Sequence, residues 1–329
     1  MRFLIAGLGS IGRRHLKNLL SLGQRDILLF RSKLSTLPED ELEDIPVEVD
    51  IHRALAAKPN AVIISNPTAL HLDIAIPAAH AGCSLFLEKP LSNNLERIPE
   101  LEKAIESGGG KVFMGFQYRF HPGLQTIKKL LEKKEIGRVM YSRCQWGEYL
   151  PGWHPWEDYR KGYSARSDLG GGVVLSLCHP IDYLHWLLGE VAQVYAFTGK
   201  LSSLEIEVED TAEIMLRFFS GALGSLHLDY IQQPSQHFLE ITGMDGLIKW
   251  NNADGAVQLF RNSTHQWEIF PLKEGFERNN LFLDEMRHFI EIVEGNVQPL
   301  CSLQDGIFVQ KIADAIYQSS LENCIKNIS

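Results

Sequence analysis

The sequence predicts an α/β protein in which a doubly wound parallel sheet is followed by an α+β domain with an open, mostly antiparallel sheet. Three observations lead to this prediction. The chain opens with an apolar strand, a glycine-rich turn and a helix. Apolar strands then alternate with helical stretches as far as about residue 120, which is typical of parallel sheets with crossover helices. Beyond that point, apolar residues follow a period of two, which favours antiparallel strands.

The first strand and its turn predict a dinucleotide-binding unit. The apolar run Phe3–Ala6 leads into Gly7-Leu8-Gly9-Ser10-Ile11-Gly12. Gly7 suits a tight turn, Gly9 the close approach of backbone to a pyrophosphate, and Gly12 the close packing of helix on strand. The first N–H groups of the helix would face the phosphates at the positive end of the helix dipole. A purely structural turn is the alternative interpretation of these glycines.

The end of the second strand bears on the choice of cofactor. The apolar run Ile27–Phe30 is followed by Arg31-Ser32-Lys33. An acidic residue at this place binds the ribose 2′-hydroxyl of NAD, whereas Arg31 and Ser32 suit a 2′-phosphate. The sequence therefore predicts an NAD(P) site that favours NADP(H) over NAD(H), with a solvated basic loop as the alternative.

Three further apolar strands complete the predicted parallel sheet, at 61–64, 84–87 and 112–114, with helices over 70–81 and 98–107. Ser65-Asn66-Pro67 follows the first of these strands, at the carboxyl end where open α/β sheets bind ligands. The acidic stretch 39–50 is expected to be a surface connection. We place the dinucleotide-binding domain at 1–120 and the second domain at 121–329.

Alternating stretches predict the strands of the second domain, at 139–146, 191–198, 212–218, 224–230, 238–242, 247–250 and 257–260. Helical stretches are expected at 123–133, 180–188, 281–293 and 303–320.

Composition narrows the function classes. A formal net charge of -9 argues against a nucleic-acid surface, which needs excess Lys and Arg. No apolar run approaches the roughly 20 residues of a membrane helix, and Met1 enters the first strand directly, so we expect a cytoplasmic protein without membrane contact. The five cysteines are widely spaced and suit reduced thiols better than disulfides or zinc ligands, so no metal is predicted.

Lys89 is the first candidate catalytic residue. Glu88-Lys89-Pro90 follows a strand, near the place where a nicotinamide bound at the glycine turn would lie. Hydride transfer between an alcohol and a ketone also needs a proton moved at oxygen. A lysine whose pKa is lowered by a partly buried, cationic site can move that proton. An exposed lysine at a strand end is the alternative.

His179 is the second candidate. Gly170-Gly171-Gly172 precedes an apolar stretch that ends at His179-Pro180-Ile181-Asp182. Because Pro180 favours the first turn of a helix, His179 would lie at its mouth, with Asp182 close enough to cap the helix or orient the imidazole. A neutral imidazole there can share the proton of a reacting oxygen. Helix capping alone is an equally good interpretation of this His and Asp.

Taken together, these motifs resemble the Gfo/Idh/MocA oxidoreductases. The resemblance rests on the opening glycines, Glu88-Lys89-Pro90, Gly115-Phe116-Gln117-Tyr118-Arg119, the triple glycine with His179 and Asp182, and Glu209-Asp210-Thr211-Ala212. It implies a Rossmann domain plus an open-faced sheet domain, and NAD(P)-dependent oxidation or reduction at a carbon bearing a hydroxyl. Sugars, inositols or sugar nucleotides are the implied substrates. The second domain would bind the substrate and form a homodimer or homotetramer through its exposed sheet face.

By position, the resemblance implies that Lys89 is the catalytic lysine, that His179 is the active-site histidine, and that Pro90 follows a cis peptide bond. It also implies a set of cofactor contacts at the strand ends, namely Ser65, Asn66, Pro67, His71, Glu88, Lys89 and Gln117. One position departs from the family pattern. Many sugar and inositol dehydrogenases of this family carry an aspartate four residues before the histidine, where this chain has Leu175, followed by Ser176. Lys89 and His179 would then handle the proton alone, or with Tyr163, Asp182 or substrate groups.

The segment 147–160 is aromatic and polar, and therefore poor core material. Aromatic faces pack on sugar rings, and arginines bind carboxylate or phosphate. The predicted substrate contacts, besides Lys89 and His179, are Arg119, Trp153, Trp156, Tyr159, Arg160, Tyr163, Arg166 and Asp182. The segment is similar to one in family members of nonulosonate-type sugar biosynthesis. A lid or subunit-contact loop is the alternative.

The sequence thus predicts an NAD(P)-dependent dehydrogenase or reductase acting on a sugar-like substrate, neutral or anionic, with Lys89 as general acid/base and His179 assisting. A non-catalytic NAD(P)-binding sensor or transcriptional co-regulator on the same fold is the rival hypothesis, which the retention of both residues disfavours. A dihydrodiol or tetrapyrrole substrate is a further alternative, disfavoured by the loop rich in Arg and Trp.

Overall fold

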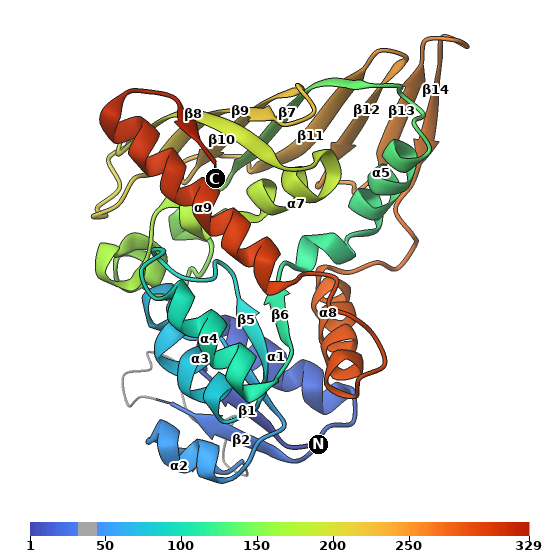
Figure 1. The fold of residues 1–329 in the computed structure, drawn as a ribbon. Helices are drawn as coiled ribbons and strands as arrows, with labels where there is room; N and C mark the ends of the chain where they lie inside the picture. Colours follow the sequence, from blue (N-terminus) through green and yellow to red (C-terminus); the bar gives the residue numbers. More distant parts are fainter. Residues whose placement is uncertain (32–44, 329) are drawn as a thin grey trace. The chain divides into compact units, whose positions relative to one another are not determined.

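The computed structural model describes residues 1–31 and 45–328, which form two compact units (Figure 1). Unit 1 comprises Met1–Gln117 and Arg278–Ile307, and unit 2 comprises Tyr118–Glu277 and Phe308–Ser329. Unit 1 therefore takes in a helix from near the end of the chain that the sequence analysis grouped with the second domain. No described helix combines the length and the apolar character needed to cross a membrane.

Unit 1 is built on a six-stranded parallel sheet with the strand order β3-β2-β1-β4-β5-β6. The strands are β1 (Phe3–Ala6), β2 (Ile27–Phe30), β3 (Val47–Glu48), β4 (Ala61–Ile64), β5 (Ser84–Glu88) and β6 (Val112–Gly115). The order reverses between β1 and β4, which is the switch point at which such sheets bind ligands. This confirms the predicted doubly wound sheet.

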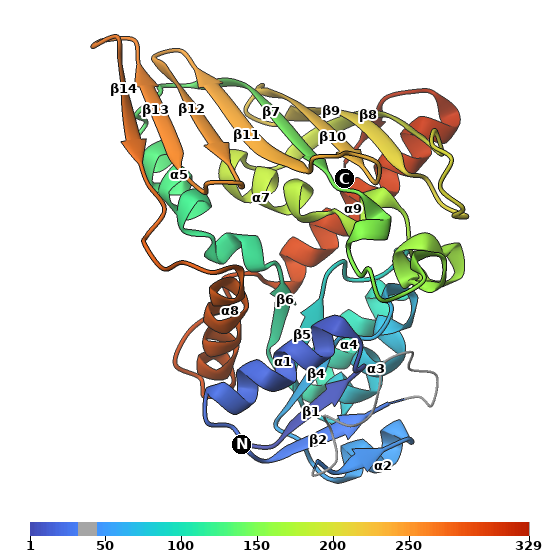
Figure 2. The same ribbon diagram turned by 180° about the vertical axis from the view of Figure 1, so that it is seen from behind.

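Helices cover both faces of this sheet (Figures 1 and 2). They are α1 (Ser10–Ser21), α2 (Ile51–Ala56), α3 (His71–His80), α4 (Ile98–Gly108) and α8 (Arg278–Val293). α8 packs beside α1, and its Phe289 ring lies 5.4 Å from that of Phe86 in β5. This contact explains why α8 belongs to unit 1, although more than 150 residues separate it from β6 in the chain.

Unit 2 carries a nine-stranded sheet with the order β14-β13-β12-β11-β7-β10-β9-β8-β15. The strands are β7 (Val139–Gly147), β8 (Val191–Gly199), β9 (Thr211–Phe218), β10 (Leu223–Asp229), β11 (Gln236–Gly243), β12 (Gly246–Asn251), β13 (Val257–Arg261), β14 (Gln266–Phe270) and β15 (Lys326–Asn327). β7 and β10 pair in parallel, and the other neighbours are antiparallel. The predicted open, mostly antiparallel sheet is confirmed.

Helices cover one face of the second sheet and leave the other face open (Figure 2). They are α5 (Pro122–Glu132), α6 (Val173–Ser176), α7 (His179–Leu188) and α9 (Leu303–Glu322). Short 3₁₀ turns are η2 (Thr68–Leu70) in unit 1, η3 (Gln117–Phe120) at the unit boundary, and η4 (Leu150–Gly152), η5 (Tyr159–Lys161), η6 (Tyr163–Ala165) and η7 (Ser167–Leu169) in unit 2.

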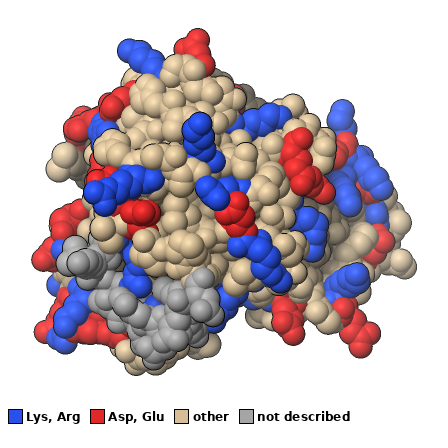
Figure 3. Space-filling view, turned by 90° about the horizontal axis from the view of Figure 1, so that it is seen from below, with Lys and Arg blue, Asp and Glu red and all other residues tan. Residues whose placement is uncertain are grey.

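Three strands differ from the sequence analysis. The expected surface connection at 39–50 contributes β3 where Val47 pairs with Leu29, because even two residues can extend a parallel edge. β14 was not expected, although Trp267 and Ile269 alternate with polar residues, and most of its residues are exposed. The two-residue strand β15 was not expected either. On the face drawn in Figure 3, basic and acidic side chains are interspersed, and those that are described form no continuous basic surface there.

Candidate active site

The glycine turn between β1 and α1 forms an open cradle. Gly7 has φ +94°, and a Cβ there would lie 2.5 Å from the backbone nitrogen of Asn66. A Cβ on Gly12 would lie 2.0 Å from the carbonyl oxygen of Gly7, so a side chain cannot fit between helix and strand. Gly9, by contrast, faces open space and is the N-cap of α1 without a side-chain cap. The first N–H groups of α1 are therefore left for a ligand, and the cradle suits the pyrophosphate of a dinucleotide.

The loop that follows β4 lies at the same switch point and contacts the glycine turn. The Ser65 hydroxyl is buried and donates to the backbone carbonyls of Ala6 and Gly7, at 3.1 and 2.9 Å. The Asn66 side chain donates to Leu70 O, and Pro67 is the N-cap of η2. The structure thus uses the side chains of Ser65 and Asn66 to shape the loop.

His71, at the start of α3, joins two strand-end loops. Its imidazole is buried, with Nδ1 3.0 Å from Pro90 O and Nε2 3.0 Å from Asn66 O. Burial lowers the pKa of His71, and the two carbonyl contacts and the charge of Glu88 oppose this shift. A neutral ring donates to one of the two carbonyls, whereas the cationic ring donates to both.

Lys89 is half-buried and follows β5 directly, with a cis peptide bond to Pro90 as expected. The Glu88 side chain before it is buried, and its Oε1 lies 2.6 Å from Nε2 of His15 on α1. The second carboxylate oxygen accepts the backbone N–H of Lys89 at 3.3 Å. The sequence analysis did not assign His15 a role. A histidine on the apolar face of the first helix was the feature that could have drawn attention to it.

Two other predicted cofactor residues lie at the ends of their strands. Arg31 is half-buried directly after β2, and its N–H donates to Glu48 O at 3.2 Å. Gln117 is buried at the start of η3. Ser32 lies outside the described residues.

His179 begins α7 and is held in an aromatic cage on the covered face of the second sheet. Its ring centroid lies 5.1 Å from that of Tyr118 and 5.7 Å from that of Trp146, with the Trp146 plane nearly parallel. The His237 ring also stacks on Trp146, with centroids 4.3 Å apart, and its Nε2 lies 3.0 Å from the Tyr183 hydroxyl. Burial lowers the pKa of His237 well below its usual range, so this ring is neutral. The cage fixes the plane of His179.

Glu209 anchors the short helix that leads to His179. Its carboxylate accepts the N–H of Val174 at 3.2 Å and the hydroxyl of Tyr317 at 2.8 Å. A Cβ on Gly172, which has φ +108°, would lie 2.4 Å from this carboxylate. Burial raises the pKa of Glu209, and the hydrogen bonds from Tyr317 and Val174 oppose the shift. The triple glycine and the Glu209 segment, which lie far apart in the sequence, thus meet at the start of α6.

Arg119 and Asp182, both predicted substrate contacts, bind each other. Arg119 Nε lies 3.1 Å from both carboxylate oxygens, and Nη2 lies 2.6 Å from Oδ1. Both side chains are almost fully buried. The pair fastens η3 to the first turn of α7, one turn from His179. Removing either partner would leave a buried charge, at a cost of about 3–5 kcal/mol.

A polar hollow of about 410 Å³ lies at the end of the predicted substrate loop, lined by residues of 160–168 and 205–207. Its lining includes Arg160, Arg166 and Glu205. Arg160 is ion-paired with Asp158 and Glu205, and Arg166 with Asp168, so both guanidinium groups already have carboxylate partners. An anionic ligand would have to exchange with these carboxylates.

The aromatic residues of the loop differ in exposure. Trp156 is 72% exposed, whereas Trp153 packs edge-on against Tyr230. The Tyr159 hydroxyl accepts the N–H of Glu205, and Tyr163 is half-buried in η6. Trp156 is therefore the aromatic face of this loop most accessible to a ligand.

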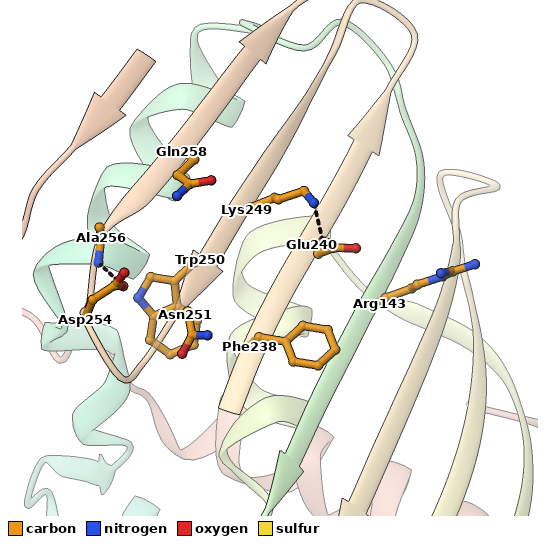
Figure 4. Close-up of a pocket in the computed structure, with 9 residues that line it drawn as sticks. All are labelled: Arg143, Phe238, Glu240, Lys249, Trp250, Asn251, Asp254, Ala256 and Gln258. Atoms are coloured by element: carbon orange, nitrogen blue, oxygen red, sulfur yellow. Dashed lines mark hydrogen bonds and ion pairs between the residues drawn. The ribbon is translucent and has the colours of Figure 1, made fainter. Parts of the chain in front are cut away.

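A second hollow, of about 390 Å³, lies on strands β7 and β11 to β13 and contains none of the predicted site residues (Figure 4). Arg143, Glu240, Lys249 and Gln258 line it, with Lys249 2.9 Å from Glu240. Across the described residues, no group of three or more His, Cys, Asp or Glu side chains is arranged to hold a metal ion.

Two models of one family match the chain. "Oxidoreductase family, NAD-binding Rossmann fold" matches residues 1–116, and "GFO/IDH/MocA C-terminal domain" matches residues 124–249. The chain belongs to the Gfo/Idh/MocA oxidoreductases. The first of these models matches the part of the chain that contains the glycine cradle and Lys89, and the second matches the part that contains His179.

Relatives of this Gfo/Idh/MocA protein act on sugars and inositols, judged by their names. Myo-inositol 2-dehydrogenase of Thermotoga maritima is 28% identical over 323 residues, which cover 93% of this chain and 92% of that protein. A structure of levoglucosan dehydrogenase in complex with NADH has a TM-score of 0.87 at 21% identity, covering 100% of this chain and 99% of that one. The WlbA dehydrogenase from Bordetella pertussis, in complex with NADH and UDP-GlcNAcA, has a TM-score of 0.83 at 24% identity, with the same coverage.

Proposed function

We propose that this Gfo/Idh/MocA protein is an NAD(P)-dependent dehydrogenase that oxidises a hydroxyl-bearing carbon of a sugar-like substrate, or reduces the corresponding ketone. The observation that carries the proposal is the cradle at the switch point of unit 1, where Gly9 leaves the N-terminus of α1 open. Lys89, half-buried at the end of β5, lies in the same unit and supplies an amine for proton transfer.

The chemistry needs a hydride and a proton to leave the alcohol separately. NAD(P), when bound, supplies the hydride acceptor. Lys89 in its neutral form takes the hydroxyl proton during oxidation and returns it during reduction. His179 is the second residue of the proposed proton chemistry, and its aromatic cage holds the imidazole in one orientation. Leu175, where many family members carry an aspartate, leaves Lys89 as the principal acid/base.

A sugar-like substrate is supported by the names of the relatives and by the exposed Trp156 of the substrate loop. An apolar sugar face packs on an indole ring, and Arg160 and Arg166 can bind a carboxylate or phosphate by exchanging their present partners. Myo-inositol, levoglucosan and UDP-GlcNAcA therefore form the first substrate panel.

The decisive experiment compares the wild type with Lys89→Ala. Wild type is expected to reduce NAD(P)⁺ with at least one panel compound, and Lys89→Ala is expected to lose roughly 10²–10⁴-fold in kcat while binding NAD(P)H normally. Reduced-cofactor absorbance gives the rate, and fluorescence titration gives cofactor affinity. Near-normal turnover in Lys89→Ala removes this residue from the mechanism. A wild type that binds cofactor but turns over neither this panel nor a wider one supports the non-catalytic sensor instead.

Arg31 tests the cofactor preference. We propose that NADP(H) is favoured because Arg31 follows β2, where the ribose of a bound dinucleotide is recognised. Arg31→Asp is expected to weaken NADP(H) binding by roughly tenfold or more, or about 1.4 kcal/mol, and to leave NAD(H) binding equal or stronger. The matched control is Arg53→Asp on α2. A ratio of dissociation constants that Arg31→Asp leaves unchanged contradicts the assignment.

A further inference from the structure

The Glu88 carboxylate is held on both of its oxygens. His15 contacts Oε1 at 2.6 Å, and the backbone N–H of Lys89 reaches Oε2 at 3.3 Å. Side-chain exposure is 0% for His15 and 9% for Glu88, so water does not compete for these contacts. Glu88, the residue before the proposed acid/base, is therefore held by His15 on α1, which lies 73 residues earlier in the chain.

The residue after Lys89 is held in a similar way. The Pro90 carbonyl contacts Nδ1 of His71, whose other ring nitrogen contacts Asn66 O at the end of β4. Lys89 therefore lies between two residues that are each tied to a buried imidazole.

We propose that Glu88, clamped by His15, is the positioning residue that fixes the carboxyl end of β5 and so aims the amine of Lys89. This inference rests on the proposed function, because it assigns Lys89 the proton transfer. Neither Glu88 nor His15 takes part in the chemistry itself. Precise placement matters, since a shift of about 1 Å at a reacting group costs roughly 10²-fold in rate.

A second buried carboxyl group, that of Glu285, lies within electrostatic reach of Glu88. Glu285 on α8 is fully buried nearby, and its two carboxylate oxygens find no hydrogen-bond partner among the described residues. Burial and the charge of Glu88 raise the pKa of Glu285 well above its ordinary value, so Glu285 keeps its proton. Arg14 and His71 also lie within electrostatic reach of Glu88. Of the two buried carboxyl groups, Glu88 is the one with a histidine partner.

Glu88→Gln is the sharpest variant. An amide of the same shape has one acceptor oxygen, so it can serve either His15 or the Lys89 N–H, and its NH₂ must face the other donor. We expect kcat to fall roughly 10- to 100-fold, with KM and the NADH dissociation constant within about twofold of the wild type. His15→Phe should give the same split, and His15→Gln, whose amide can still donate to Glu88, should restore most of kcat.

A second measurement needs neither substrate nor cofactor. Acetic anhydride acetylates Lys89 and the exposed Lys103 of α4 in the same sample, and peptide mass spectrometry gives the ratio of the two rates. Glu88→Gln should change this ratio several-fold through Lys89 alone. Glu285→Gln, which keeps the shape of a residue that is already neutral, is the matched control and should leave the ratio and kcat unchanged.

The outcomes separate the inference from the function it rests on. Wild-type kcat and labelling ratio in Glu88→Gln overturn the inference, whatever Lys89→Ala shows. If Lys89→Ala retains turnover, the proposed function fails while the labelling ratio still decides the positioning role. If His15→Phe does not fold, Glu88→Gln carries the test by itself. A parallel fall in kcat and cofactor affinity assigns Glu88 a general structural role and also overturns the inference.

Discussion

Glu285 carries a carboxyl group that is buried away from water, although such groups are better solvated at the surface. It points from α8 into unit 1, where its side chain is 0% exposed and has no described hydrogen-bond partner. An ionised carboxylate there would be costly, because it would lose water without gaining donors and would face Glu88. The residue is therefore neutral in the folded protein and ionised in the unfolded chain at neutral pH.

This difference predicts a pH-dependent stability. A carboxyl whose folded pKa lies above its ordinary value of 4.5 contributes fully below that value, and its contribution is lost as pH rises toward the folded pKa. Glu285→Gln removes the titration. We expect it to unfold at higher denaturant concentration than the wild type near pH 7.5, with the gap closing as pH falls to about 4. Glu106→Gln on the exposed face of α4 is the control. A pH-independent gap contradicts the explanation.

Contacts between side chains that lie far apart in the chain could not be predicted from the sequence. Lys89 and His179 were predicted because each follows a recognisable local pattern, a strand end and a proline-started helix. Their neighbours come from distant parts of the chain: Arg119 and Asp182 are 63 residues apart, and His15 and Glu88 are 73 apart. No periodicity in a sequence links such positions, so Arg119 and Asp182 were predicted as substrate contacts rather than as a pair.

At the scale of elements, burial on both faces made the strands of unit 1 predictable. β1, β2 and β4 have the predicted bounds, since a parallel strand covered by helices on both sides is a short, continuous apolar run. β14 lacks that signal because it is an exposed edge strand. α6 and the 3₁₀ turns of the substrate loop were missed because each is too short to show a helical period.

The unit β1–turn–α1 makes a prediction about its two inner glycines. A Cβ on Gly12 meets the carbonyl of Gly7 at 2.0 Å, whereas a Cβ on Gly9 meets no described atom within 4 Å. Gly12→Ala should therefore lower the free energy of unfolding by at least about 1–3 kcal/mol. Gly9→Ala should change it by less than about 1 kcal/mol but weaken NAD(P)H binding roughly tenfold or more. Chemical denaturation and fluorescence titration measure the two effects. Unchanged cofactor affinity in Gly9→Ala would show that the pyrophosphate does not approach this turn.

The largest feature of unit 2 is the open face of its nine-stranded sheet. Register places a set of apolar side chains on this face, namely Tyr141, Tyr195, Phe197, Met215, Leu223, Phe238, Phe260, Trp267 and Ile269. The hollow of Figure 4 lies among them and adds the Lys249–Glu240 ion pair. Half or more of the Met215 and Phe197 surface is exposed. Apolar surface of this extent, mixed with a few charges, is typical of a protein interface.

We expect this open face to join copies of the chain into a homodimer or homotetramer. Met215 lies on β9, between Tyr195 of β8 and Ser225 of β10, so Met215→Arg would bury an unpaired charge in a symmetric contact, once on each side. Sedimentation velocity should show the wild type as an oligomer at micromolar concentration and Met215→Arg as a smaller species. Leu321→Arg on α9, where the side chain is 86% exposed, is the matched control and should keep the wild-type mass. If Met215→Arg sediments like the wild type, or if the wild type is a monomer, the open face has another role.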